Sequence, residues 1–373
     1  MKFLTLQKII VFTLFWMSIP LSFSQTIPLS EEAQISVLTC GTSNEVYALF
    51  GHTAIRVKDK RSGVDEVYNY GAFDFGTPNF ALQFVKGNLQ YFAVANSYPD
   101  FIANYSYEKR SVYEQVLNIS APQKQRLFAL LNESLLLENR EYTYKFIDQN
   151  CTSMAVAVIN KAINQEVIVK KGDLKTSYRS ILYPYFNNHF YEQLGTSIIF
   201  GHKTDQAGTA IFLPFELKQN LNQIQLGQSP IVKQNNTLLE FKPEPNSSWW
   251  NNPYTYLVVL AFVLLINKKT TDTVYLASMG VLGIAFVILG FYSTHLELGN
   301  NYNILLFNPI LLVLLYFAKA NNTKWMKYTL TINLIALGIY TLLLLNKAHL
   351  WIVAPLIITS GVVLVRGFWK KEV

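Results

Sequence analysis

The sequence predicts an α+β domain followed by an all-α membrane domain of about five transmembrane helices. From about residue 25 to residue 248, charged and amide side chains are spread among aromatic ones, and segments with strand periodicity are interspersed with helical ones. From residue 249 to residue 369 the chain is mostly apolar, and its charges are confined to short gaps. Each part is long enough to form a unit, and the first can bury its own core.

Residues 1–24 have the pattern of a secretory signal peptide. Lys2 and Lys8 give a positive start, an apolar run follows at residues 9–19, and small residues around Ser24 offer a cleavage site before Gln25. The alternative is an uncut first transmembrane helix. We expect export, which places the domain at residues 25–248 outside the cytoplasm.

Alternating apolar and polar residues predict the strands of this domain, at residues 34–39, 51–58, 66–70, 86–94, 110–117 and 141–147. Helices are expected at residues 97–107 and, after a capping box at residues 120–123, as far as about Leu137. In the second strand, Ile55 and Val57 share one face, so His52 lies on the other, more polar face.

The strand at residues 141–147 leads into Cys151, which opens a helix predicted to run to about Ile163. A cysteine in the first turn of a helix meets unpaired backbone N–H groups and the positive end of the helix dipole, which both favour the thiolate. Cys151 is therefore a candidate nucleophile, with His52 as its candidate base. The alternative is a disulfide with Cys40, the only other cysteine, which is as reasonable in an exported protein.

The second domain, residues 249–373, contains five apolar segments: Pro253–Ile266, Thr273–Ser293, Ile304–Ala318, Met326–Leu345 and Leu350–Trp369. With the first domain outside, the inner flanks hold eight of the nearby basic residues, and the outer loops hold only Lys347. This asymmetry follows the positive-inside rule. The net charge of +7 therefore indicates membrane topology, and the sequence shows no nucleic-acid, nucleotide or zinc motif.

Several motifs resemble the Lnb family of bacterial lipoprotein N-acyltransferases. They are Leu38–Gly41, Tyr47–Val57, Tyr68–Phe75, Lys86–Leu89 and Asn150–Thr152, and in the membrane domain His295 and Asn301–Asn303 up to Pro309. The soluble domain of this family is similar to permuted papain-like folds, such as the NlpC and lecithin:retinol acyltransferase groups. In those folds the histidine strand precedes a helix that opens with Asn-Cys, which is the order found here.

The resemblance implies that Cys151 is the nucleophile and that His52 is its base. It also implies the reaction: an acyl chain moves from a phospholipid, through a thioester on Cys151, to the α-amine of a diacylglyceryl-cysteine lipoprotein. The protein would be a multi-pass protein of the bacterial inner (cytoplasmic) membrane with its N-terminal domain in the periplasm. The expected partners are the phospholipid donor, the lipoprotein acceptor and the membrane, and no metal or other cofactor is required.

A third catalytic residue should lie on the strand after His52, where Asn69 and Asp74 are the candidates. Arg56 on the His52 face and Arg110 at the start of another strand could each bind a phosphate headgroup bidentately. The alternatives are that Asn69 closes a turn, that Asp74 is a capping residue and that the arginines are solvated at the surface.

In the membrane domain, His295 and Asn303 lie in a polar loop beyond the second span, where polar groups are costly and tend to be functional or paired. With the resemblance, we expect this loop to guide the lipid or the acceptor, whereas an ordinary wet loop is the alternative. Two other functions remain open on sequence alone. One is a membrane-anchored papain-like cysteine hydrolase of peptidoglycan or peptides, and the other is a non-enzymatic binding domain stapled by Cys40 and Cys151.

Overall fold

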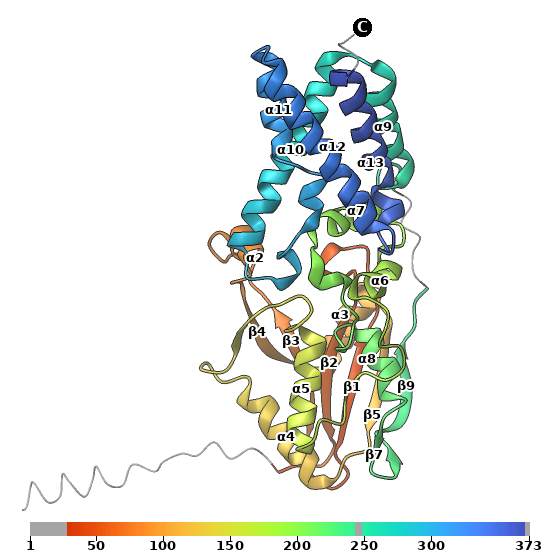
Figure 1. Ribbon diagram of the computed structural model, residues 1–373. Helices are drawn as coiled ribbons and strands as arrows, with labels where there is room; N and C mark the ends of the chain where they lie inside the picture. Colours follow the sequence, from red (N-terminus) through yellow and green to blue (C-terminus); the bar gives the residue numbers. More distant parts are fainter. Residues whose placement is uncertain (1–27, 243–247, 370–373) are drawn as a thin grey trace, which may run out of the picture.

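A computed structural model describes residues 28–242 and 248–369, so the predicted signal peptide lies outside the described part of the chain. Figure 1 shows a sheet-rich domain at one end of a helical bundle. This arrangement confirms the predicted order of an α+β domain followed by a helical membrane domain.

A seven-stranded antiparallel sheet organises the first domain. In spatial order its strands are β6 (Glu141–Thr143), β4 (Gln90–Ser97), β3 (Val64–Ala72), β2 (His52–Asp59), β1 (Gln34–Cys40), β5 (Val112–Leu117) and β9 (Val232–Leu239). The hairpin predicted around residue 52 forms β2 and β3, and its register pairs Ala54 with Asn69. His52 and Asn69 therefore come from neighbouring strands near the middle of the sheet.

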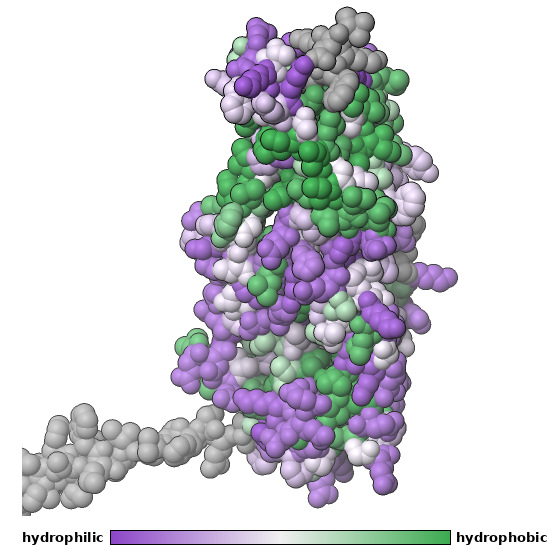
Figure 2. Space-filling view, viewed as in Figure 1, coloured by the Kyte–Doolittle hydropathy of each residue, from purple (hydrophilic) through white to green (hydrophobic). Residues whose placement is uncertain are grey.

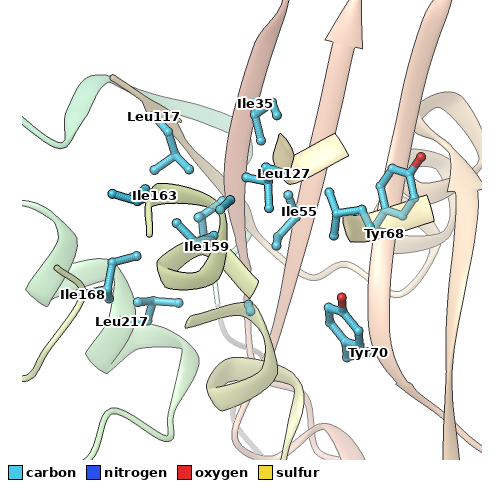
Figure 3. Close-up of a cluster of buried hydrophobic side chains, with 14 of the residues drawn as sticks. Ile35, Ile55, Tyr68, Tyr70, Leu117, Leu127, Ile159, Ile163, Ile168 and Leu217 are labelled. Carbon is cyan, nitrogen blue, oxygen red and sulfur yellow. The ribbon is translucent and has the colours of Figure 1, made fainter. Parts of the chain in front are cut away.

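Helices cover both faces of the sheet. On one face, α4 (Ala121–Glu133), α5 (Cys151–Ile163) and α8 (Pro214–Leu221) pack against alternate strand residues in the main core. Figure 3 shows side chains from these helices and from the strands pointing toward one another, including Ile55 of β2 and Ile159 of α5. On the other face, α3 (Tyr98–Tyr107) contributes two buried aromatic rings to a smaller core.

Helix α3 covers the more polar face of β2, on which the sequence placed His52. Ala54 and Arg56, which share that face with His52, are only 1% and 4% exposed. Antiparallel sheets often leave one face open to water, but helices cover both faces of this one. The residues that bury the second side, Phe101 and Tyr105, come from a helix forty residues further along the chain.

Two other elements differ from the sequence prediction. Residues 86–94 were expected to form one strand, but a short helix α2 (Phe80–Lys86) ends at Gly87, whose φ of +76° closes the helix, and β4 begins only at Gln90. In the polar segment after residue 187 the periodicity is weak and predicts no helix or strand, whereas the structure has α7 (Phe190–Ile199), α8 and the edge strand β9, which pairs with β5.

The C-terminal domain contains five apolar helices within residues 248–369: α9 (Pro253–Ile266), α10 (Lys269–Tyr292), α11 (Ile310–Lys319), α12 (Thr323–Leu344) and α13 (Leu350–Leu364). Four segments are long and apolar enough to cross a membrane, the one containing α11 starting at Leu296, whereas α9 has only 14 residues. Figure 2 shows the apolar surface of these helices as a band at one end of the molecule.

Polar contacts at both ends of the bundle agree with the predicted topology. Lys347, between α12 and α13, reaches Asp205 of the first domain, with 3.6 Å between Nζ and Oδ2. At the opposite end, Arg366 forms an ion pair with Asp272 at the start of α10. The loop predicted to lie outside therefore contacts the first domain, and residues predicted to lie inside are at the far end.

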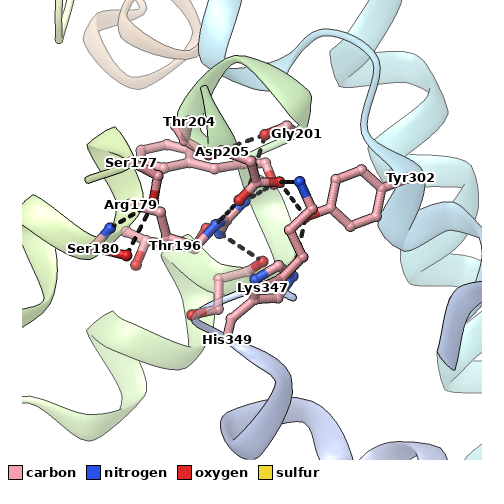
Figure 4. Close-up of polar contacts among 12 residues, drawn as sticks. Ser177, Arg179, Ser180, Thr196, Gly201, Thr204, Asp205, Tyr302, Lys347 and His349 are labelled. Atoms are coloured by element: carbon pink, nitrogen blue, oxygen red, sulfur yellow. Dashed lines mark hydrogen bonds and ion pairs between the residues drawn. The ribbon is translucent and has the colours of Figure 1, made fainter. Parts of the chain in front are cut away.

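A buried polar cluster joins the two domains (Figure 4). Arg179 of α6 (Tyr178–Leu182) donates to Asp205 Oδ1 over 2.7 Å and to backbone carbonyls near the end of α7. Asp205 also accepts a hydrogen bond from Tyr302 of the membrane domain, whose hydroxyl lies 3.2 Å from His349 Nε2. Because these groups are paired and buried, the cluster fixes how the first domain sits on the bundle.

Candidate active site

The first turn of α5 presents Cys151 as the sequence predicted, and the helix runs from Cys151 to Ile163. Asn150 caps this helix: its Oδ1 accepts hydrogen bonds from the backbone N–H groups of Thr152 and Ser153, at 2.9 and 3.0 Å. The Asn150 amide in turn donates to two backbone carbonyls, which holds the cap in place. The cap leaves the backbone N–H of Cys151 itself available at the helix start.

His52 and Cys151 meet beside Gly71, at a bulge in β3. A Cβ atom on Gly71 would lie 3.8 Å from His52 Cε1 and 3.9 Å from Cys151 Cβ, and the glycine has a φ of +116°, which L side chains rarely adopt. The imidazole and the thiol lie close enough for each to shift the pKa of the other. A side chain at residue 71 would therefore pack directly beside both groups.

Asn69 holds the other nitrogen of the imidazole. The distance between His52 Nε2 and Asn69 Oδ1 is 3.1 Å, and Asn69 Nδ2 donates to Val67 O and Asn96 Oδ1. The amide is thus oriented by its own partners and leaves His52 Nδ1 for the thiol. Asp74, the other candidate for this position, is exposed and accepts a hydrogen bond from the backbone of Gly76.

The electrostatics of the pair favour a thiolate beside an imidazolium. Burial opposes ionisation of the Cys151 thiol, but attraction to His52 and hydrogen bonds from His52, the Thr53 backbone and the Thr152 hydroxyl bring the pKa of Cys151 below its ordinary value. Burial also opposes the charge on His52, yet Cys151 and then Asn69 raise the pKa of the imidazole above its ordinary value. Each group therefore stabilises the charged form of the other.

Tyr142 is a residue at the site that the sequence analysis did not single out. Its hydroxyl is buried and has no hydrogen-bond partner among the described residues, and it lies 3.9 Å from the position of a Cβ on Gly71. Burial raises the pKa of Tyr142, so the hydroxyl stays protonated as a donor. In the strand that leads to Cys151, a tyrosine is a common strand residue, and nothing in the sequence distinguishes Tyr142 from Tyr144 as a functional residue.

The loop after α10 supports the segment that precedes Cys151. Glu297 is 1% exposed, and its Oε1 accepts a hydrogen bond from the backbone N–H of Ile147 over 3.1 Å. Lys145 Nζ donates to Thr294 Oγ1 over 2.5 Å. The membrane domain therefore contacts the chain four and six residues before the thiol.

The structure places the predicted substrate-binding residues in internal contacts. Arg56 forms ion pairs with Asp65 and Glu114 and stacks on the ring of Tyr98. Arg110 is buried, and its Nε donates a hydrogen bond to the carbonyl oxygen of Gly41. A phosphate headgroup would have to displace these partners, so neither guanidinium group is free to bind one as predicted.

Two predicted residues of the membrane domain are also engaged. His295 Nε2 lies 2.9 Å from the carbonyl oxygen of Phe84, while its buried Nδ1 has no partner in the described chain. Asn303 is fully buried, donates to Phe200 O and accepts a hydrogen bond from Tyr340 over 2.7 Å. Both residues connect the membrane domain to other parts of the fold.

The two cysteines are both free, and Cys40 is buried on the strand next to His52. This finding removes the alternative of a binding domain stapled by a disulfide. Within the described ranges, no group of three or more His, Cys, Asp or Glu side chains could hold a metal ion.

Fold and site together define a multi-pass membrane protein whose external α+β domain carries a Cys–His–Asn arrangement. Residues 24–183 match the Lnb N-terminal periplasmic domain, and residues 245–371 match the Lnb transmembrane domain. The chain therefore belongs to the Lnb family, as its motifs indicated, and its N-terminal domain is periplasmic. No curated protein and no solved structure matches the chain significantly.

Proposed function

We propose that this protein is a membrane-bound lipoprotein N-acyltransferase with Cys151 as its nucleophile. The observation that supports this proposal best is the Cys151–His52–Asn69 arrangement at the start of α5. The segment that precedes Cys151 is in addition hydrogen-bonded to the membrane domain. The acyl donor is a membrane phospholipid, and the acceptor is the α-amine of a diacylglyceryl-cysteine lipoprotein.

In the first step, the Cys151 thiolate attacks an ester carbonyl of the phospholipid. When the tetrahedral intermediate collapses, the C–O bond breaks, His52 gives its proton to the leaving glycerol oxygen, and a lysophospholipid departs. In the second step, the lipoprotein amine attacks the thioester. His52 accepts a proton from the amine, the C–S bond breaks, and the thiolate is restored.

Two donors suit the oxyanion of the tetrahedral intermediates. The capping side chain of Asn150 occupies the N–H groups of Thr152 and Ser153, so the N–H of Cys151 is the one left at the helix start. The hydroxyl of Tyr142 has no hydrogen-bond partner among residues 28–242 and 248–369, and it lies beside Gly71. A donor that is already in place stabilises the developing charge without reorganisation.

The membrane bundle contributes by position. Both substrates are lipids anchored in the bilayer, and a tethered domain replaces a search through solution by local encounter. The contacts of Glu297 and Lys145 fix the loop before Cys151 relative to the end of α10. The bundle therefore keeps the thiol at a fixed distance from the end of the α10 span.

The proposal is tested by incubating the full-length protein in nanodiscs with a phospholipid of one defined acyl chain and a diacylated lipopeptide. We expect N-acylated lipopeptide and lysophospholipid in equal amounts. Cys151→Ala should reduce the rate by about 10³-fold or more, because it removes the nucleophile. Cys40→Ala, which removes the other thiol, is the matched control and should retain activity.

Equal product formation by wild type and Cys151→Ala would refute the proposed nucleophile. Release of free fatty acid without acylation of the lipopeptide would assign the same residues to a hydrolase. That outcome would favour the alternative left open by the sequence.

A further inference from the structure

Helix α2 exposes apolar side chains that the fold does not cover. None of its seven residues is buried, and Leu82 and Phe84 are 61% and 43% exposed. Phe75, in the turn before the helix, is 70% exposed. A helix of this length does not persist by itself in water, and exposed apolar surface of this kind marks an interaction site.

The end of α2 is fixed to the end of a membrane span. Its last three carbonyl oxygens, those of residues 84–86, accept hydrogen bonds from residues 293–295 at the end of α10, at 2.7 to 2.9 Å. Figure 1 shows α2 beside the end of α10 nearest the first domain. Since α10 runs from Lys269 to Tyr292 as a candidate span, α2 lies at the level where that span leaves the bilayer.

The apolar surface of α2 continues the lipid-facing surface of α10. Ile288 and Phe291 in the last turns of α10 are 56% and 90% exposed. Lys86 Nζ lies 5.5 Å from the centre of the Tyr292 ring, a pairing typical of a membrane interface. The lipid bilayer that surrounds the candidate span α10 is therefore expected to cover the exposed side chains of α2 as well.

A row of aromatic rings connects this segment with the site. Phe75 contacts Phe73 with 4.8 Å between ring centres, Phe73 contacts Tyr91 at 5.2 Å, and Tyr91 stacks on Tyr144 at 4.4 Å. Tyr91, Tyr144 and Cys151 pack in the same core cluster. The row thus runs from the exposed end at Phe75 to the surroundings of the thiol.

We propose that residues 73–86 insert into the bilayer leaflet facing the N-terminal domain, and that an acyl chain passes along these rings to Cys151. The insertion stands on the exposed apolar surface and its continuity with α10. The passage of the acyl chain rests in addition on the proposed acyltransferase function.

Insertion is tested without any catalytic turnover. Leu82→Cys is made in a Cys151→Ser background and labelled with the fluorophore NBD, because Cys40 is fully buried and should not react. Leu137→Cys in the same background is the matched control, since Leu137 is 89% exposed in the loop after α4. Full-length protein is placed in phosphatidylethanolamine–phosphatidylglycerol nanodiscs.

We expect the probe at residue 82 to be quenched by nitroxide-labelled lipid and shielded from aqueous iodide, with the reverse at residue 137. If both probes respond as the water-exposed control does, insertion is overturned.

Passage of the acyl chain is tested by Leu82→Asp, with Leu137→Asp as the control. A carboxylate at an inserted position should lower kcat/KM for a long-chain phospholipid by about tenfold or more. It should leave the acylation of Cys151 by a water-soluble short-chain thioester unchanged, and the control should change neither. Equal losses on both substrates would overturn the acyl route. A wild-type protein that uses neither substrate would instead refute the proposed function and the acyl route, while the quenching result still decides insertion.

Discussion

The orienting role of Asn69 can be tested by removing its amide. In Asn69→Ala, His52 loses the hydrogen bond of 3.1 Å from its Nε2. A hydrogen bond to a charged group contributes about 1.5–3 kcal/mol, and ~1.4 kcal/mol corresponds to a factor of ten. We therefore expect kcat/KM for transfer to the lipopeptide to fall by about 10- to 100-fold, because the imidazole is no longer held toward the thiol.

The pH profile separates this role from a purely structural one. The hydrogen bond to Asn69 helps to raise the pKa of His52, so its loss lowers that pKa. Since the mechanism needs the imidazolium as a proton donor, the alkaline limb of kcat/KM should move to lower pH in Asn69→Ala. In Asn69→Asp a carboxylate favours the imidazolium more strongly, and the same limb should move to higher pH.

Asn96→Ala is the matched control, because Asn96 is exposed and contacts Asn69 Nδ2 but not His52. Asn69 keeps its hydrogen bond to Val67 O in this variant, so we expect a much smaller loss of activity and a smaller shift of the alkaline limb than in Asn69→Ala. An Asn69→Ala protein with unchanged kcat/KM and an unchanged alkaline limb would refute the assignment of Asn69 as the residue that orients the base.

Three further substitutions test other parts of the site and fold. Tyr142→Phe should lower kcat by about 10²-fold if the hydroxyl serves the oxyanion, yet leave Tm unchanged because that hydroxyl bonds to no residue in the described part of the chain; a fall in Tm with unaltered kcat would assign it a structural role. Gly71→Ala should slow alkylation of Cys151 by iodoacetamide, because a Cβ at a φ of +116° is strained and lies against both thiol and imidazole, and a wild-type alkylation rate would contradict this geometry. Arg179→Ala leaves Asp205 buried without its main partner and should cost about 3–5 kcal/mol of stability, seen as a lower Tm in nanodiscs; an unchanged Tm would show that the cluster does not hold the domains together.

Local signals in the sequence were sufficient for the elements that carry the site. The pattern after the strand at residues 141–147 predicted α5 from Cys151 to Ile163, and alternation predicted the strand that carries His52. Cys151 and His52 are about a hundred residues apart in the sequence, and this separation does not indicate whether they are close in space. Resemblance to the Lnb family supplied the pairing.

Features that depend on distant parts of the chain could not be predicted. Arg56 reads as a solvated arginine on a polar strand face, and only the packing of α3 buries it with Asp65 and Glu114. The edge strand β9 is rich in amide side chains and becomes a strand by pairing with β5. Helix α2 has no buried face to set its periodicity, and the strand predicted at residues 86–94 overlaps it only at Lys86.

The most direct measurement of the central claim is the mass of the Cys151 peptide after the full-length protein meets a phospholipid of defined acyl chain without any acceptor. The account predicts one acyl chain on Cys151, released by neutral hydroxylamine as a thioester, absent from Cys40 and strongly reduced in His52→Ala. An unmodified Cys151 peptide, in a preparation that still acylates the lipopeptide, would contradict it.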